Sequence, residues 1–392
     1  MVIKRTSYHS WKKGELAKGC MSCVKGEKMV VFITGVCNNK CFYCPVSEQK
    51  NLKDVVYANE WNAKFVGRFD EPLKRGELNV FFEEARLTEA RGCGITGGDP
   101  LLVPKRTASL IRALKKKFGK KFHIHLYTPL RNLTKEKLRL LAKAGLDEIR
   151  FHPDVWDKKF WDRIDWAKHY QWTIGVEIPA LPGFEKQTKE LCDFIEDKIS
   201  FLNLNELEIS DTNASDLVGK GFLPKDRISY GVKGSEAVAK RLLRYCEKKH
   251  YSVHYCTTKL KDSVQLAQRM KRRSKNARLK TDIVTEDGML VRGVIYLKKT
   301  EPTFSYRKRI FSFSEKEREK VLARLEKTKE LLVKEYKILP SHVTIDNLKL
   351  RILTSERIVR MLSPILKKKK LLPAVVEEYP TWDGMEIEVE ML

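Results

Sequence analysis

The residues best suited to chemistry are three closely spaced cysteines near the start of the chain. Cys37, Cys41 and Cys44 form a CxxxCxxC sequence that directly follows a short apolar run predicted to be a β-strand. Three thiolates at this spacing can bind three irons of a cubane cluster, which leaves the fourth iron free to bind a substrate. A loop at the carboxyl end of a strand is also where α/β folds place their reactive groups. The motif therefore predicts an iron–sulfur site.

The same segment also fits a structural zinc site. Cys20-x-x-Cys23 and Cys41-x-x-Cys44 are separated by 17 residues, a spacing that suits four cysteines around one zinc ion. This interpretation leaves Cys37 without a role and makes no use of the residues that end the next predicted strand. Zinc is therefore kept as the alternative to the iron–sulfur cluster.

The next predicted strand ends in Gly97-Gly98-Asp99-Pro100, where two glycines let a ligand lie against the backbone beside an acidic side chain. A GGD turn alone is weak evidence, but here it follows the cysteine motif. Together the two motifs resemble those of the radical S-adenosylmethionine (SAM) superfamily, and most of all archaeal proteins related to pyruvate-formate-lyase activating enzymes. The resemblance covers residues 18–260.

The resemblance implies a [4Fe–4S] cluster on the three motif cysteines, with the fourth iron binding the amino and carboxylate groups of SAM. Tyr43, just before the last cysteine, occupies the position that contacts adenine in this family. The Gly97-Gly98-Asp99 turn would receive the methionine ammonium group. Thr128, Arg150 and His152 end later predicted strands, where family members bind the ribose and carboxylate of SAM. The implied cofactors are therefore a [4Fe–4S] cluster and SAM.

The implied reaction begins with an electron from a reductant such as ferredoxin or flavodoxin. Cleavage of the sulfonium bond of SAM then yields methionine and a 5′-deoxyadenosyl radical, which removes a hydrogen atom from the substrate. The protein would exclude water and place one C–H bond within reach.

Three further residues are candidates for substrate handling. Glu177 and Glu208 are acidic residues in apolar predicted strands, where a buried carboxylate needs a partner or a ligand. Cys256 ends the last predicted strand of this region. A structural ion pair is the alternative for either glutamate. Cys20 and Cys23 alone are too few ligands for a second cluster. Such a cluster would need help from other cysteines, which are Cys93, Cys192, Cys246 or Cys256.

These residues must be positioned by repeated βα units. Short β-rich runs alternate with stretches of helical period, which favours a parallel sheet covered by helices, either doubly wound or curled into a barrel. The resemblance implies the second form, a partial (β/α)6 barrel. The predicted strands span 29–35, 93–97, 122–127, 148–152, 173–178, 204–209 and 252–255.

Beyond the βα region the pattern changes to that of an α+β domain. A hairpin turn is predicted at 286–288, a capping box at Ser314–Glu317 opening a helix to about residue 338, a strand over 343–353, a helix over 355–370 and a final strand pair around 383–384. The predicted divisions are an N-terminal CxxC segment (1–28), the βα domain (29–258), a basic linker helix (259–280) and the α+β domain (281–392).

The chain of 392 residues carries 77 Lys and Arg against 51 Asp and Glu, a net charge of +26. This excess favours a nucleic-acid partner over a merely charged surface, and residues 259–280 alone hold nine basic residues and one acidic one. We therefore expect an RNA substrate, most of all tRNA, docked by the C-terminal domain. The alternatives are a protein substrate, activated as a glycyl-radical enzyme or modified on a side chain, and a zinc-ribbon RNA-binding protein. The absence of an apolar segment long enough for export or membrane insertion predicts a cytoplasmic protein without a membrane partner.

Overall fold

The computed structural model describes residues 2–392, and the chain divides into two compact units, Met1–Arg269 and Met270–Leu392. The division falls inside the segment predicted as a separate basic linker. That segment is helical, as a π-helical stretch (Leu260–Leu266) followed by α8 (Ala267–Ala277). Within residues 2–392, no helix has both the length and the apolar character needed to cross a bilayer.

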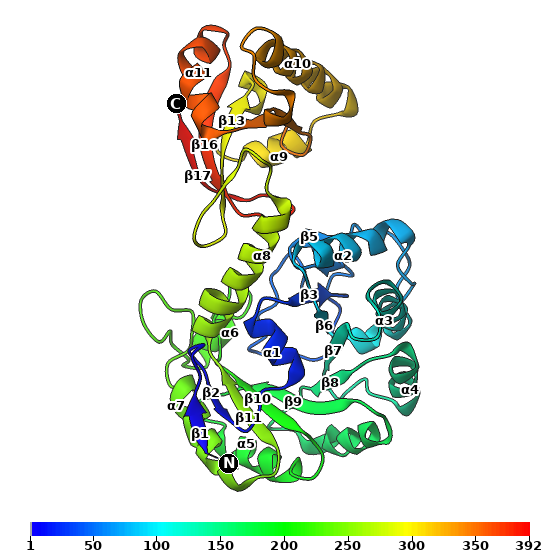
Figure 1. Ribbon diagram of the computed structural model, residues 1–392. Helices are drawn as coiled ribbons and strands as arrows, with labels where there is room; N and C mark the ends of the chain where they lie inside the picture. Colours follow the sequence, from blue (N-terminus) through cyan, green and yellow to red (C-terminus); the bar gives the residue numbers. More distant parts are fainter. Residues whose placement is uncertain (1) are drawn as a thin grey trace. The chain divides into compact units, whose positions relative to one another are not determined.

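The first unit contains an 11-stranded sheet, counted over the described residues. Its centre consists of parallel strands in chain order, which form an open arc (Figure 1). Short antiparallel strands extend both edges, and the sheet does not close. The predicted partial barrel of βα units is thus confirmed as an open one. The parallel strands are β3 (Lys28–Phe32), β6 (Gly92–Thr96), β7 (His123–Thr128), β8 (Glu148–Phe151), β9 (Thr173–Pro179), β10 (Phe201–Asn205) and β11 (Ser252–Cys256). The edge strands are β1 (Ile3–Arg5) and β2 (Trp11–Lys13) beside β11, and β4 (Tyr57–Ala58) and β5 (Trp61–Asn62) beside β3.

Helices connect the parallel strands and cover the outer face of the sheet (Figure 1). In α3, Leu110, Ile111 and Leu114 are fully buried, and each such side chain stabilises the fold by roughly 1.5–3 kcal/mol. Thr134 caps α4 by accepting a hydrogen bond from the N–H of Lys137 (3.2 Å). The helices between the parallel strands are α2 (Arg75–Leu87), α3 (Pro104–Phe118), α4 (Lys135–Ala144), α5 (Glu185–Phe194), α6 (Ala214–Gly219) and α7 (Ser235–Tyr245).

The N-terminal CxxC segment, predicted as a separate piece, packs into the first unit. Strand β2 pairs with β11, and α1 (Lys18–Val24) then packs against β3, β6 and β7 inside the arc (Figure 1). The approach of α1 is close at Gly19, where an added Cβ atom would lie 2.5 Å from Nη2 of Arg150 and 2.6 Å from Nδ1 of His125. Only glycine therefore fits at this position without moving buried polar side chains.

The second unit, Met270–Leu392, contains the α+β elements predicted for residues 281–392. The capping box at Ser314 is confirmed, since the N–H of Ser314 donates to Glu317 Oε2 (2.9 Å) and the N–H of Glu317 donates to Ser314 Oγ (3.3 Å). The strand predicted over 343–353 is instead a hairpin, because the Asp346 carboxylate accepts two backbone N–H groups and turns the chain. The antiparallel strands of the second unit are β12 (Ile283–Val284), β13 (Leu290–Tyr296), β14 (Thr344–Asp346), β15 (Arg351–Thr354), β16 (Leu372–Glu378) and β17 (Glu386–Met391). Its helices are α9 (Tyr306–Phe311), α10 (Glu315–Lys334) and α11 (Glu356–Lys368).

Candidate active site

The three motif cysteines lie in the long loop between β3 and β4, and all three are partly exposed. The N–H of Cys44 donates to the carbonyl oxygen of Cys41 (3.1 Å), which folds the loop into a turn. Burial, together with the nearby charges of Asp154 and of the other two thiols, raises the pKa of Cys41 to about 12. Three thiolates so close together repel one another unless positive charge lies between them, and bound metal supplies that charge. The loop therefore has the donor chemistry of an iron–sulfur site.

The two glycines that follow β6 hold this loop in place. The N–H of Gly98 donates to the carbonyl oxygen of Thr34 (2.7 Å), and the N–H of Asp99 donates to that of Val36 (2.9 Å). An added Cβ atom would lie 2.2 Å from the Thr34 oxygen at Gly97 and 2.3 Å from the Val36 oxygen at Gly98. The glycines are therefore required for the close approach of two backbone segments.

Asp99 links the glycine turn to the loop after β7. Its buried carboxylate accepts hydrogen bonds from the Thr128 hydroxyl (2.8 Å), the Asn132 side chain (2.6 Å) and the N–H of Leu101 (2.9 Å). Burial raises the pKa of Asp99, although these three hydrogen bonds act in the opposite direction. Asn132 also exchanges two hydrogen bonds with Asn38 inside the cysteine loop (2.7 and 3.0 Å). A continuous polar chain thus runs from β7 to the cysteines.

Asn132→Ala is expected to loosen the cysteine loop, because it removes both hydrogen bonds to Asn38 and leaves one Asp99 oxygen buried without a donor. Such a loss costs about 1–3 kcal/mol. We expect iron to leave the reconstituted protein about tenfold faster when a chelator is added, measured by the decay of cluster absorbance. The control is Asn51→Ala, since Asn51 is exposed in the same long loop. Equal rates of iron loss in both variants would contradict the role of Asn132.

Tyr43 and His152 form one hydrogen-bonded pair. His152 Nδ1 lies 2.7 Å from the carbonyl oxygen of Glu177 and must donate to it, which leaves Nε2 as an acceptor. The Tyr43 hydroxyl lies 2.8 Å from that Nε2 and therefore donates to it. Burial lowers the pKa of His152 below its usual range, which keeps the ring neutral as this arrangement requires. His152 thus fixes the ring of a residue inside the cysteine motif.

Arg150 is buried and forms an ion pair with the largely buried Glu177. Arg150 Nη1 lies 2.7 Å from Glu177 Oε2, and its Nε donates to Glu148 (2.6 Å). Asn203 (2.8 Å) and Asn205 (3.0 Å) also donate to the Glu177 carboxylate. Burial acts to raise the pKa of Glu177, but the charge of Arg150 and these hydrogen bonds outweigh it, so the pKa is lowered. Glu177 is therefore a charged carboxylate inside the sheet.

Glu208 and Cys256 lie near a second cation, Lys261. Glu208 forms an ion pair with Lys261, whose charge also opposes the effect of burial on the pKa of Cys256. The Cys256 thiol is buried and lies near those of Cys20 and Cys23 on α1. Of the other three cysteines considered for this group, Cys93 is fully buried in β6, and Cys192 and Cys246 contact each other in the helical layer.

The structure separates the four cysteines of the zinc alternative. Cys20 lies beside Asn203 and near Arg150 and Glu177, whereas Cys41 lies near Cys37 and Cys44. Within residues 2–392, no three His, Cys, Asp or Glu side chains are arranged to hold a single metal ion. The arrangement therefore does not match a zinc ribbon.

Most of the predicted site residues come together around the cysteine loop and the inner face of the sheet. Glu208 forms its ion pair with Lys261, and its carbonyl oxygen accepts a hydrogen bond from Asn213 (3.0 Å). Sequence reasoning missed Asn132 and Asn213, whose side chain donates to the carbonyl oxygen of Tyr43 (3.0 Å). The signal that could have indicated them is their position, since each follows the carboxyl end of a parallel strand.

Known proteins resemble this chain in sequence. Residues 31–176 match the family model of the Radical SAM superfamily. Over 290 residues the chain is 40% identical to a putative glycyl-radical enzyme activating enzyme of Methanocaldococcus jannaschii, an alignment that covers 72% of this chain and 74% of that protein.

Two solved structures are similar to the chain at low sequence identity. Coproporphyrinogen III oxidase from Escherichia coli, a radical SAM enzyme, is 11% identical with a TM-score of 0.34 over 62% of this chain and 58% of its own. The radical SAM methyltransferase TsrM from Kitasatospora setae is 11% identical with a TM-score of 0.37 over 69% of this chain and 55% of its own. The chain thus spans less than two thirds of the length of either protein.

The family match and the relative agree with the motifs from which the resemblance was predicted. The relative is similar over nearly three quarters of both chains, and the family match includes the cysteine motif and the GGD turn. The cofactors of this family are a [4Fe–4S] cluster and SAM, as predicted. The chain is an enzyme that belongs to the radical SAM superfamily.

Proposed function

We propose that this radical SAM enzyme abstracts a hydrogen atom from a protein, either to activate a glycyl-radical enzyme or to modify a side chain. The observation that carries the proposal is the 40% identical relative, a putative glycyl-radical enzyme activating enzyme. The charge of the sequence alone favoured RNA, and the relative favours the alternative. A reductant such as ferredoxin or flavodoxin would supply the electron.

Cys37, Cys41 and Cys44 would hold the cluster. The chemistry that the cluster and SAM supply when bound is one-electron cleavage of a sulfonium bond, giving a carbon radical that abstracts hydrogen. The chain's own part is to keep the loop rigid. Gly98 and Asp99 anchor it through their backbone N–H groups, and Asn132 anchors it through Asn38.

The side chains predicted to bind SAM have most of their hydrogen-bonding groups occupied within the chain. Both carboxylate oxygens of Asp99 accept hydrogen bonds, and both ring nitrogens of His152 have partners. Arg150 is paired with two glutamates. We therefore assign Asp99, Thr128, Arg150 and His152 to positioning the loop and Tyr43, and leave direct contact with SAM to backbone groups of the Gly97–Gly98 turn.

Among the residues proposed for substrate handling, the two glutamates are neutralised. Glu177 is paired with Arg150 and Glu208 with Lys261, so each carboxylate fits a structural ion pair better than an acid–base role. Cys256 remains the candidate that could face a substrate.

RNA is the second candidate substrate, and the net charge of +26 is the observation that favours it. Proteins that bind RNA through phosphates carry such an excess of Lys and Arg. The basic segment 259–280 remains the predicted contact surface.

The substrate class can be tested with extract from cells that lack this gene, in which the substrate accumulates unmodified. The reconstituted enzyme is given SAM and dithionite under anaerobic conditions, and 5′-deoxyadenosine is measured with and without extract. We expect extract to stimulate its formation, and we expect the stimulation to survive RNase treatment and to be lost after protease treatment. The opposite pattern would overturn the protein substrate in favour of RNA.

A further inference from the structure

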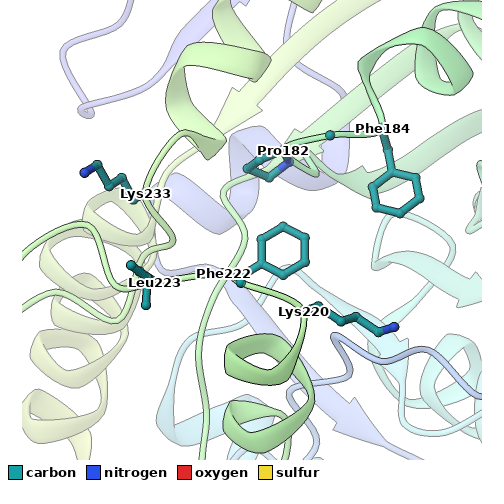
Figure 2. Close-up of a pocket in the computed structure, with 8 residues that line it drawn as sticks. Pro182, Phe184, Lys220, Phe222, Leu223 and Lys233 are labelled. Atoms are coloured by element: carbon teal, nitrogen blue, oxygen red, sulfur yellow. The ribbon is translucent and has the colours of Figure 1, made fainter.

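A pocket of about 570 Å³ opens in the first unit, away from the buried ion pair of Arg150. Its walls come from two segments, residues 182–184 after β9 and residues 220–223 after α6, with Lys233 on the rim. Figure 2 shows Lys220 and Lys233 on opposite sides of the Phe222 ring. We call this cavity the Phe222 pocket. Its volume lies within the range of about 300–1,000 Å³ that is usual for binding sites.

The wall of the Phe222 pocket is continuous with the cysteine loop. The Phe222 ring stacks on that of Phe42, with centroids 6.0 Å apart and an interplanar angle of 20°. Phe184 also approaches Phe42, at 6.3 Å between centroids. Because Phe42 stands between Cys41 and Tyr43, whatever fills the pocket lies one ring away from the motif.

Two cations of the pocket lack an anionic partner. Lys220 and Lys233 are exposed, and within residues 2–392 neither has a carboxylate oxygen within 4 Å. Lys220 instead lies over the Phe42 ring, 5.2 Å from its centroid. The neighbouring Lys225 shows the contrast, since it is paired with Glu236 at 2.7 Å. The pocket thus joins apolar walls to uncompensated positive charge.

Aliphatic side chains are exposed in the pocket wall and in the segments that precede and follow residues 220–223 in the chain. Leu223 in the pocket wall is 55% exposed, and Val218 in α6 is 54% exposed. Ile228 is 97% exposed at the tip of a loop whose base is joined by the Pro224–Val232 bridge. Exposed apolar groups beside a pocket mark contact surfaces for proteins. Proteins bind single-stranded RNA by stacking its bases on aromatic rings and arginine side chains. The three exposed aliphatic side chains therefore fit a protein partner better than RNA.

We propose that the Phe222 pocket docks a segment of the protein substrate in which an acidic side chain stands next to an aromatic or apolar one. The apolar side chain would lie against Phe184 and Phe222, and the acid would pair with Lys220 or Lys233. The inference rests on the proposed function, because a protein substrate must be held beside the cysteine loop. It adds the chemical character of the segment that is recognised.

The pocket is tested by fluorescence anisotropy with a labelled peptide, Asp-Phe-Glu-Phe-Asp, and the full-length reconstituted enzyme. We expect saturable binding that weakens about tenfold in the double variant Lys220→Glu, Lys233→Glu at low salt, with a smaller effect at high salt because both charges are at the rim. The matched control is the double variant Lys116→Glu, Lys143→Glu, at exposed positions of α3 and α4, which changes the net charge by the same amount and should bind as the parent does. Iron content and circular dichroism show whether each variant is folded.

Two further probes make the outcome decisive. The neutral peptide Asn-Phe-Gln-Phe-Asn should bind at least about tenfold more weakly than the acidic one, since it cannot pair with either lysine. Equal affinity for both peptides, no binding of either, or a tighter and lysine-dependent complex with hexauridylate would each overturn the proposal. The measurement needs no turnover. A negative peptide result would therefore overturn the docking site without affecting the proposed function. A negative extract experiment would overturn the proposed function without changing the measured peptide affinity.

Discussion

Cys41→Ala is expected to abolish the activity of this enzyme. Cys41 lies between the other two motif thiols, and the alanine variant leaves two thiolates to hold a cluster that takes three from the chain. We expect the anaerobically reconstituted variant to lose most of its iron and sulfide. Formation of 5′-deoxyadenosine from SAM under dithionite should fall by at least about a thousandfold, to the level without enzyme.

The matched control for this experiment is Cys192→Ala. Cys192 is a fully buried thiol in α5, beside Cys246 and away from the motif, so its replacement removes the same chemical group without touching the loop. This control should keep its iron content and its rate of SAM cleavage. A Cys41→Ala protein that still cleaves SAM at a rate near that of the parent would refute the cluster assignment.

Arg150→Met should strongly destabilise the first unit. Arg150 is 2% exposed and pairs with both Glu148 and Glu177, so methionine would leave the fully buried Glu148 and the largely buried Glu177 without the guanidinium that they share. Removing one partner of a buried ion pair costs about 3–5 kcal/mol. Anaerobic urea unfolding of the whole protein, followed by circular dichroism, should show this loss in the transition of the first unit.

The pH dependence of this loss identifies its cause. The folded pKa of Glu177 lies below its ordinary value of 4.5, so its pairing stabilises the parent fully above pH 4.5 and less as the pH falls through the folded pKa. The stability difference between parent and Arg150→Met should therefore narrow below pH 4.5. A double variant, Arg150→Met with Glu177→Gln, should recover part of the loss, because one buried charge is removed. A difference independent of pH, with no recovery, would attribute the effect to lost packing instead.

The sequence was sufficient to predict the chemistry of the cysteine loop and the order of the parallel strands. CxxxCxxC and GGD each follow a strand, and parallel strands place their carboxyl ends on one edge of the sheet. The position of each motif after its strand was therefore enough to predict that the two motifs lie close together. The ends of α4 were also predictable, because Thr134 and Gly145 are local signals. These predictions depend on residues that are close in the chain.

Features that depend on distant contacts could not be predicted in the same way. Strand β10 was expected at 204–209 but spans Phe201–Asn205, because its register is decided by pairing with β9 and β11 rather than by its own apolar alternation. Asn132 carries no local motif, and its partners Asp99 and Asn38 lie 33 and 94 residues away in the chain. The ion-pair partners of Glu177 and Glu208 could not be predicted either, because any of the 77 Lys and Arg residues was a candidate.

The pairing of β2 with β11 has a consequence for how the protein matures on the ribosome. Residues of β2 leave the ribosome early, yet their partner strand ends at Cys256, so most of the first unit must be translated before they can pair. Thr257 and His254 make further bonds to His9 and Ser10 at the same seam. This segment is thus translated before the parallel strands of the first unit and pairs only after the last of them. A nascent chain stalled before β11 should leave this segment open to protease.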